Sequence, residues 1–206
     1  MDTHCDFCLY EHLSSKTKKL GKHTFLFHEG DQIDKVFIIK EGLVKISKLY
    51  ENGDERILDI LGPNEFVALL NTLKKKEHYI ASASTLTNVV LQELSVKEVH
   101  EAYQTNANFK DSCLNCAASR VGVFQQQLIE ASNQNTEEKI LNTLKFLYRK
   151  FGVKNKDTYQ LYLPITKTDL ASIIGIRRET LSRKLSNLEK NKVLNIKKNM
   201  YEFFCM

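Results

Sequence analysis

The sequence predicts an α+β protein with an N-terminal antiparallel β-roll, a long helix after the roll, and a C-terminal winged helix-turn-helix. Short runs rich in β-branched and aromatic residues occupy the first half of the chain, and glycines at positions 30, 42, 53 and 62 separate them. Apolar residues recur at helical spacing between positions 96 and 134. The remaining residues combine helix-capping signals with two short strand-like runs.

Four segments follow from these changes of pattern. We expect an arm over residues 1–19, the β-roll over 20–100, a long helix over 101–134 and the winged domain over 135–206. The strands of the roll are expected at 24–28, 36–39, 43–47, 56–61, 79–85 and 89–94, with a short helical piece at 66–73. Turn residues such as those at 41–42 and 52–54 separate the strands.

The long helix carries an apolar stripe. Its members recur at spacings of three and four residues, and they are Leu114, Ala117, Val121, Phe124, Leu128 and Ala131. This is the pattern of a coiled-coil seam. The stripe spans fewer than three heptads, so a helix packed into the core of a single chain fits it as well.

A further helix is expected to begin the winged domain. Thr136 is a suitable N-cap, and glutamates at positions 137 and 138 suit the positive end of the helix dipole. Gly152 should end this helix. Residues 153–163 then lead through a short strand into the next pair of helices.

The segment 164–189 has the pattern of a helix-turn-helix. Thr166 with Asp169 predicts a capped first helix, and Gly175 permits the tight turn after it. A second helix is expected from Arg177 to Glu189, with three leucines on its buried face: Leu181, Leu185 and Leu188. Residues 193–204 read as a β-hairpin, which would be the wing.

The other face of the second helix carries polar side chains that suit a DNA groove. They are Arg178, Glu179, Ser182 and Arg183. Arginine can bond two acceptors of guanine, glutamate can accept a hydrogen bond from the amino group of cytosine, and serine can donate or accept. A solvated helix face would also be charged, but the turn and the capping signals agree with a recognition helix.

Charge is distributed in agreement with this interpretation. Residues 137–206 hold 15 Lys and Arg against 7 Asp and Glu, a formal charge of +8, and residues 1–136 hold 15 against 18, a charge of −3. Double-stranded DNA is therefore the expected partner of the C-terminal part. We expect further DNA contacts from four residues outside the main cluster: Arg177, Thr168, Lys197 and Lys198.

The run Arg178-Glu-Thr-Leu-Ser-Arg183 resembles the recognition helix of the CRP/FNR superfamily of bacterial transcription regulators. Glu179, Ser182 and Arg183 match the E-x-x-S-R pattern of the FNR branch, whereas Arg178 is more similar to the cyclic-AMP-receptor branch. The resemblance extends over most of the chain. It implies a cyclic-nucleotide-binding-like roll, RNA polymerase as a partner, and a homodimer on a palindromic operator. A protein that reads a palindromic operator needs two recognition helices, one from each subunit of a dimer. We therefore interpret 101–134 as the dimerisation helix.

Cyclic nucleotide is not the expected ligand of the roll. Family members that bind one hold its phosphate with a Gly-Glu pair and a later Arg-Ser or Arg-Thr step. The corresponding stretch here, 64–82, has neither a Gly-Glu pair nor an arginine before Ala81-Ser82. A different small-molecule effector in the roll, or no effector, stays open.

Five cysteines lie in the chain, four of them in two C-x-x-C pairs. Cys5 and Cys8 are on the arm, and Cys113 and Cys116 are on the long helix, where residues three apart share a face. Four thiolates can hold zinc or a 4Fe–4S cluster, two can form a switchable disulfide, and all four can be unconnected thiols. Cys205 is interpreted as a packing residue.

The resemblance bears on the choice among these thiol chemistries. FNR-branch oxygen sensors bind a 4Fe–4S cluster with several N-terminal cysteines and one from the roll, and this chain lacks the latter near residues 88–93. Its four cysteines are more similar to those of FNR-like proteins of Gram-positive bacteria, some of which use a reversible disulfide. Redox or oxygen sensing through Cys5, Cys8, Cys113 and Cys116 is therefore the expected signal.

Other functions are less well supported. The sequence has no signal peptide and no apolar run of the roughly 18 residues needed to cross a membrane, so a cytoplasmic location without a membrane partner is expected. No catalytic constellation is recognisable, and a thiol oxidoreductase would need a βαβ setting around Cys5 and Cys8. We do not expect an enzyme.

Overall fold

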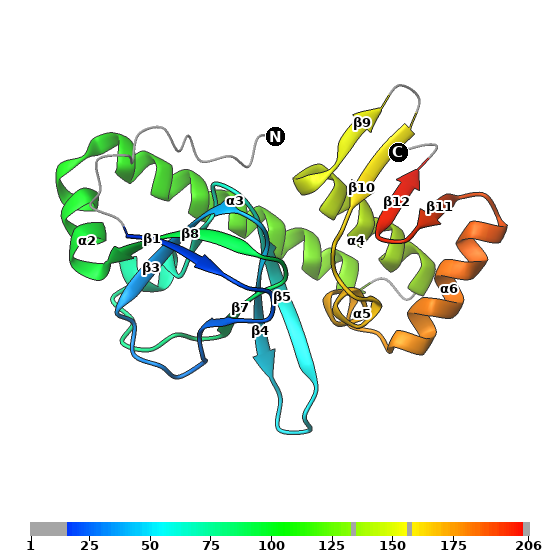
Figure 1. Cartoon of the computed structure of the whole chain (residues 1–206), viewed down its shortest axis with the longest axis horizontal. Coiled ribbons are helices and arrows are strands. Elements are labelled where there is room, and N and C mark those ends of the chain that lie inside the picture. The colour runs from blue at the N-terminus through cyan, green and yellow to red at the C-terminus, as the bar shows by residue number, and fades with distance from the viewer. Residues whose placement is uncertain (1–15, 133–134, 156–157, 204–206) are drawn as a thin grey trace. The chain divides into compact units, whose positions relative to one another are not determined.

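The computed structural model describes residues 16–132, 135–155 and 158–203, apart from the side chains of 126, 127, 130–132 and 155. The chain divides into unit 1, which ends at Val123, and unit 2, which begins at Phe124 (Figure 1). Antiparallel sheets fill unit 1, and helices with a small sheet form unit 2. The predicted fold class is confirmed.

Two four-stranded antiparallel sheets build the roll of unit 1. Sheet I contains, in spatial order, β1 (Lys16–Leu20), β8 (Val89–Ser95), β3 (Lys35–Glu41) and β6 (Phe66–Val67). Sheet II contains β2 (Phe25–Phe27), β7 (Ser82–Thr85), β4 (Val44–Leu49) and β5 (Glu55–Leu61). At the turn between β3 and β4, Gly42 has φ +87°, and a side chain there would collide with the carbonyl of Asn88.

Strand β3 is buried on both faces because successive residues serve two different cores. Phe37 and Ile39 join the core inside the roll, together with Val44, Leu61 and other residues of sheet II. Val36 and Ile38 join a second core on the other face of sheet I. Sheet I therefore lies between sheet II and a layer of helices.

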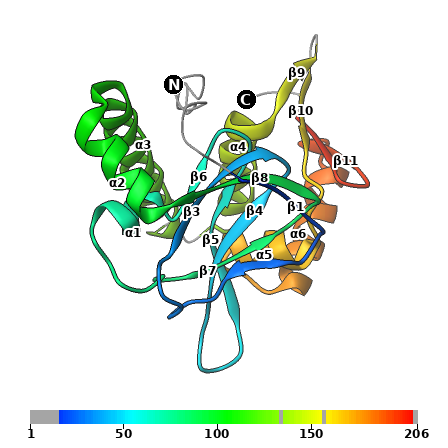
Figure 2. The same cartoon turned by 60° about the vertical axis from the view of Figure 1, so that its left-hand side comes forward.

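Three helices form that layer: α1 (Leu69–Leu73), α2 (Val96–Thr105) and α3 (Ala107–Ser132) (Figure 2). A capping box between Ser95 and Glu98 starts α2. Phe66 and Phe109 meet edge to face, with ring centroids 6.3 Å apart, and so join β6 to α3. The start of α3 is thereby fixed against sheet I.

Several predicted elements of unit 1 need correction. Residues 16–19 belong to β1, which pairs with β8, and are not part of an arm outside the roll. The strand expected at 79–85 is regular only over 82–85, because Tyr79 bonds through its backbone to Gly30 and Asp31. The helical piece expected at 66–73 is divided between β6 and α1.

The long helical segment is interrupted at Asn106. This residue is extended, with φ −115° and ψ 107°, and its side chain accepts a hydrogen bond from the amide of Phe109 at 3.0 Å. Asn106 therefore ends α2 and caps α3. Helix α3 then runs across the division between the units, and none of the described helices is both long and apolar enough to cross a membrane.

Unit 2 is a three-helix, four-strand domain. Its helices are α4 (Thr136–Phe151), α5 (Lys167–Ile174) and α6 (Arg178–Lys190). Sheet III contains, in spatial order, β11 (Leu194–Lys197), β12 (Met200–Phe203), β10 (Thr158–Tyr162) and β9 (Val153–Asn155). The segment 153–163 thus holds two paired strands where we expected one.

Helix α4 has a different N-cap from the predicted one. The side chain of Asn135, not Thr136, accepts hydrogen bonds from the amides of Glu137 and Glu138. The helix ends at Gly152 as predicted, and a β-carbon on this residue would overlap the ring of Tyr148. That ring lies edge-on to Tyr159, so Gly152 lets β9 and β10 pack closely on α4.

Candidate functional sites

The helix-turn-helix of unit 2 forms as its sequence predicts. The Thr166 hydroxyl accepts a hydrogen bond from the amide of Asp169 at 3.1 Å, and the Asp169 carboxylate accepts one from the amide of Thr166 at 3.0 Å. Gly175 adopts the left-handed conformation, with φ +76°, and its amide donates to the carbonyl of Ala171 at 2.9 Å. These contacts fix where α5 begins and where it ends.

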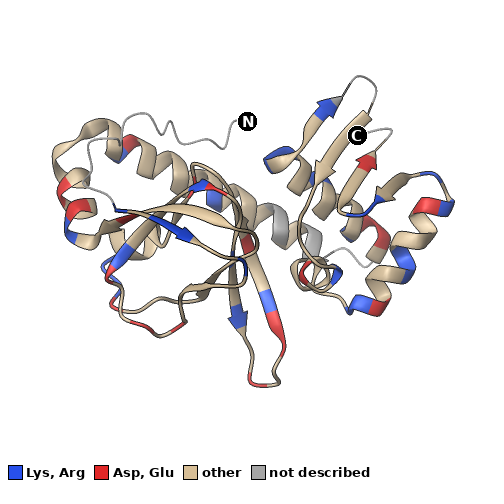
Figure 3. Cartoon of the chain, in the orientation of Figure 1, with Lys and Arg blue, Asp and Glu red and all other residues tan. Residues whose placement is uncertain are grey.

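Helix α6 has one buried and one exposed face. The buried face consists of Leu181, Leu185 and Leu188, which are at most 3% exposed. Arg178, Glu179 and Arg183 are exposed, and Ser182 is half-buried. The four predicted base readers therefore lie next to one another on α6, with Glu179 and Arg183 opposite the leucines and Arg178 and Ser182 on one flank. Charged segments of both signs run along α6 (Figure 3).

The other predicted DNA contacts lie on neighbouring elements of unit 2. Thr168 is exposed in the first turn of α5, and Arg177 is the exposed N-cap of α6. Lys197 and Lys198 are exposed in the β11–β12 wing, where Lys198 takes φ +56° in the turn. All four side chains are therefore accessible to a phosphate backbone.

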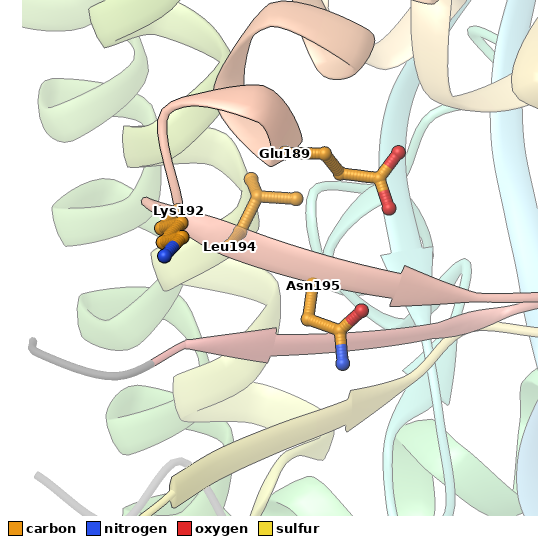
Figure 4. Close-up of a pocket in the computed structure, with 4 residues that line it drawn as sticks. All are labelled: Glu189, Lys192, Leu194 and Asn195. Carbon is orange, nitrogen blue, oxygen red and sulfur yellow. The ribbon is translucent and has the colours of Figure 1, made fainter.

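A hollow of about 410 Å³ lies between the end of α6 and β11 (Figure 4). It is lined by Glu189, Lys192, Leu194 and Asn195. The Glu189 carboxylate accepts a hydrogen bond from the amide of Ile196 at 3.0 Å, so this carboxylate joins the wing to the recognition helix. The hollow therefore reflects how the wing is attached to α6.

Glu202 holds three strands of sheet III together on one face. Its carboxylate accepts hydrogen bonds from Gln160 on β10, at 3.0 Å, and from Asn195 on β11, at 3.1 Å. These two bonds, that from Gln160 most strongly, lower the pKa of the Glu202 carboxyl below its ordinary value. The wing thus has a cross-strand polar clamp beside its basic tip.

One contact of α6 was not foreseen from the sequence. The ammonium group of Lys184 donates to the carboxylate of Glu137, in the first turn of α4, at 2.9 Å. The two residues are 47 positions apart, and no local pattern pairs them. Lys184 follows the predicted reader Arg183 directly in the sequence.

The large side chains of the apolar stripe of α3 are exposed, and Ala117 is half-buried. Leu114, Val121, Phe124 and Leu128 are 48–72% exposed, and the side chain of Ala131 lies outside the described set. A second stripe, Phe109, Cys113, Cys116 and Arg120, lies toward sheet I. The first stripe is therefore not part of the core of this chain.

Two of the four cysteines predicted to be functional, Cys113 and Cys116, are described by the structure, and both lie in the second stripe. Cys113 is 3% exposed among the residues of the helix–sheet core, and Cys116 packs against the same core. Burial, with a smaller contribution from the neighbouring Cys116, raises the pKa of the Cys113 thiol to about 12. Cys5, Cys8 and Cys205 lie outside the described residues. Over 16–203, apart from the gaps, no cluster of three or more candidate ligands occurs.

The turn of the roll that leads from β6 into α1 has an unusual backbone conformation. Ala68, which precedes α1, takes the left-handed conformation with φ +71°. The next residue, Leu69, is 2% exposed, and Ala81 is 5% exposed. Both of these side chains are therefore apolar and buried.

Two family profiles match the chain. The one described as "Cyclic nucleotide-binding domain" matches residues 17–106, and the one described as "Crp-like helix-turn-helix domain" matches residues 138–202. The two matches fall in unit 1 and unit 2 respectively. They agree with the roll and with the helix-turn-helix described above.

Known proteins are similar to the chain over most of its length. It is 25% identical over 188 residues to the "Anaerobic regulatory protein" of Bacillus subtilis, and the aligned region covers 91% of this chain and 79% of that protein. It is 22% identical over 189 residues to the "Transcriptional activator protein Anr" of Pseudomonas protegens, covering 92% and 77%. Its fold is similar to that of FixK2 from Bradyrhizobium japonicum, with a TM-score of 0.82 at 16% identity over 93% of each chain.

Proposed function

The chain belongs to the CRP/FNR superfamily of bacterial transcription regulators, and from this premise we propose that it is a homodimer that reads a palindromic operator. One observation carries the proposal. Arg178, Glu179 and Arg183 are exposed together on α6 outside its buried leucine face, which is the arrangement that a major groove can read. We propose RNA polymerase as its protein partner.

Pairing through α3 follows from its exposed apolar stripe. Four described members of the stripe are about half to three-quarters exposed, although they follow the spacing of a coiled-coil seam. Apolar side chains in such a row are stabilised when a second helix covers them. A second copy of the chain, related by a two-fold axis, supplies the complementary stripe on its α3 and the second recognition helix on its α6.

We further propose that redox state or oxygen controls this regulator through Cys5, Cys8, Cys113 and Cys116. The support is that Cys113 and Cys116 lie on one face of α3 at the core that joins the helix to the roll. Two thiols from the arm would complete a set of four, which suits a 4Fe–4S cluster, zinc, or a disulfide. A bound metal or cluster would supply a redox- or metal-dependent link between arm and helix.

A thiol–disulfide switch and a metal site can be distinguished in the purified protein. Anaerobic purification followed by metal analysis and an absorption spectrum distinguishes a cluster, zinc and metal-free thiols. Replacing Cys5 and Cys116 together by serine should then abolish any redox dependence of DNA binding. DNA binding that responds equally to oxidant in this variant would contradict control by the four cysteines.

A small-molecule effector in the roll is the second candidate signal, and the match of residues 17–106 to a cyclic nucleotide-binding domain favours it. Cyclic nucleotides in particular are less well supported, because Leu69 and Ala81 are apolar and cannot bond a ribose or a phosphate. Calorimetry with cyclic AMP and cyclic GMP tests this directly. If either nucleotide bound with measurable heat, the roll and not the thiols would be the proposed sensor.

Selection from a random DNA library tests the central function. The full-length protein should enrich a palindromic duplex, and it should bind this duplex more tightly than a shuffled duplex of the same composition, under reducing or oxidising conditions. Equal binding to both duplexes under both conditions would contradict sequence-specific regulation.

A further inference from the structure

The recognition helix is attached to the rest of unit 2 by both apolar and ionic contacts. Leu181, Leu185 and Leu188 bury one side of α6. The ion pair between Lys184 and Glu137 joins α6 to the first turn of α4, with 30% and 34% of the two side chains exposed. By comparison, the side chains of the surface pair Lys97–Glu101 are 85% and 63% exposed. The α6 pair is therefore better shielded from solvent.

Lys184 lies at the border between the two faces of α6. It follows the exposed Arg183 and precedes the buried Leu185 in the sequence. Its partner is well fixed, because the amide of Glu137 donates to the Asn135 side chain at 3.0 Å within the N-cap of α4. The carboxylate thus projects from an ordered first turn and not from a loop.

The two kinds of contact constrain α6 differently. Apolar packing is non-directional, so the leucines hold α6 against the core but specify its rotation about its own axis only loosely. A charge-assisted hydrogen bond has a preferred distance and direction. A bond at the border of the buried face therefore resists rotation of α6, and that rotation decides where Arg178, Glu179 and Arg183 point.

We propose that Lys184 and Glu137 are positioning residues, which set the rotation of the recognition helix and so the discrimination among DNA sequences. Neither residue needs to contact a base for this role. The proposal rests on the proposed function of α6 as a DNA reader, and it adds residues that act through the readers Arg178, Glu179 and Arg183.

The substitution Glu137→Gln separates positioning from electrostatics, because a neutral glutamine oxygen holds the Lys184 ammonium group more weakly than a carboxylate does. Removing a negative charge should, by itself, strengthen binding of the protein to any duplex. Loss of positioning should instead weaken binding to the selected palindromic duplex. We expect the ratio of its affinity to that for the shuffled duplex to fall about two- to fivefold, the size of effect measured for exposed ion pairs.

Glu138→Gln is the matched control, because it makes the same charge change one residue along in the same turn. The Asn135 side chain donates to Glu138 at 3.2 Å, and a glutamine oxygen can still accept this bond. The ratio should stay at the wild-type value in this variant. It should also be retained in Lys184→Arg, which keeps a cation facing Glu137.

Fluorescence anisotropy with both duplexes, on full-length proteins with matching circular dichroism spectra, gives the ratio. Equal ratios for Glu137→Gln, Glu138→Gln and the wild type would overturn the positioning role while leaving the proposed function intact. A wild-type protein that bound both duplexes equally would overturn the proposed function, and the positioning role with it.

Discussion

The guanidinium of Arg120 donates a hydrogen bond to the backbone carbonyl of Phe66 at 2.9 Å, and so joins the middle of α3 to β6. Arg120 ends the stripe of α3 that begins with Phe109 and continues through the two cysteines. Phe66 is two residues before Ala68, the residue with φ +71° at the start of α1. The contact therefore ties the proposed dimerisation helix to the turn of the roll that leads into α1.

Replacing Arg120 by methionine should destabilise the roll. The variant loses a hydrogen bond from a charged donor, and we expect the free energy of unfolding to fall by about 1–2 kcal/mol. Urea denaturation followed by circular dichroism measures the change. Lys97→Met is the control, because its side chain is 85% exposed and the loss of its surface ion pair should cost less than about 0.5 kcal/mol. Equal effects of the two substitutions would contradict a specific role for Arg120.

Replacing Val121 by glutamate should prevent pairing of two chains. Val121 is 54% exposed in the middle of the apolar stripe, and in a symmetric pair two carboxylates would meet at an interface that excludes water. Analytical ultracentrifugation should show a monomer at concentrations where the wild type is a dimer.

Asn115→Glu is the control for this pairing prediction. Asn115 is exposed on α3 but belongs to neither stripe, so its variant should sediment like the wild type. A Val121→Glu variant that remained dimeric would show that the stripe does not form the interface.

The sequence predicted the fold where local chemistry decides it. The capping box at Thr166 and the left-handed Gly175 depend on nearby atoms, so spacing alone located the helix-turn-helix. Strand β1 was missed because three of its five residues are lysines, and it lies on the edge of sheet I with exposed side chains. Its pairing with β8 depends on residues more than 65 positions away. No local signal marks it as a strand.

The candidate sites divide in the same way. The readers on α6 could be grouped from helical periodicity, which is a local property. Sequence spacing placed Cys113 and Cys116 on one face but could not show that Cys113 is 3% exposed, since its surroundings come from sheet I and other helices. The Lys184–Glu137 and Arg120–Phe66 contacts join distant segments, and periodicity carries no information about them.

Arg183→Ala and Lys198→Ala should weaken DNA binding in different ways. If Arg183 reads a base, its loss should cost about 1–3 kcal/mol on the selected duplex and relax the preference at one position of each half-site. If Lys198 contacts phosphate, its loss should weaken binding to all duplexes alike and lower the salt dependence by about one charge. Anisotropy titrations over a salt series distinguish the two. A uniform loss for Arg183→Ala would assign it to the phosphate backbone.

Tyr79 should make the stability of the roll depend on alkaline pH. Its ring stacks on Phe27, with centroids 3.6 Å apart, and its hydroxyl donates to the carbonyl of Lys35 at 2.8 Å. Burial, which disfavours the phenolate, raises the pKa of Tyr79 from 10.0 to about 12. The unfolded chain therefore releases this proton first, so the stabilisation is complete below pH 10 and is lost as the pH rises toward 12.

The variant Tyr79→Phe isolates this contribution. It keeps the buried ring but has no proton to lose, so its free energy of unfolding should fall less than that of the wild type between pH 10 and 12. We expect the two pH profiles to converge by about 1–3 kcal/mol over this range. Burial also raises the pKa of Tyr201, but that contribution is common to both proteins and cancels in the difference. Urea titrations at a series of pH values give both profiles. Parallel profiles from pH 10 to 12 would mean that the folded roll accommodates the Tyr79 phenolate as readily as water does.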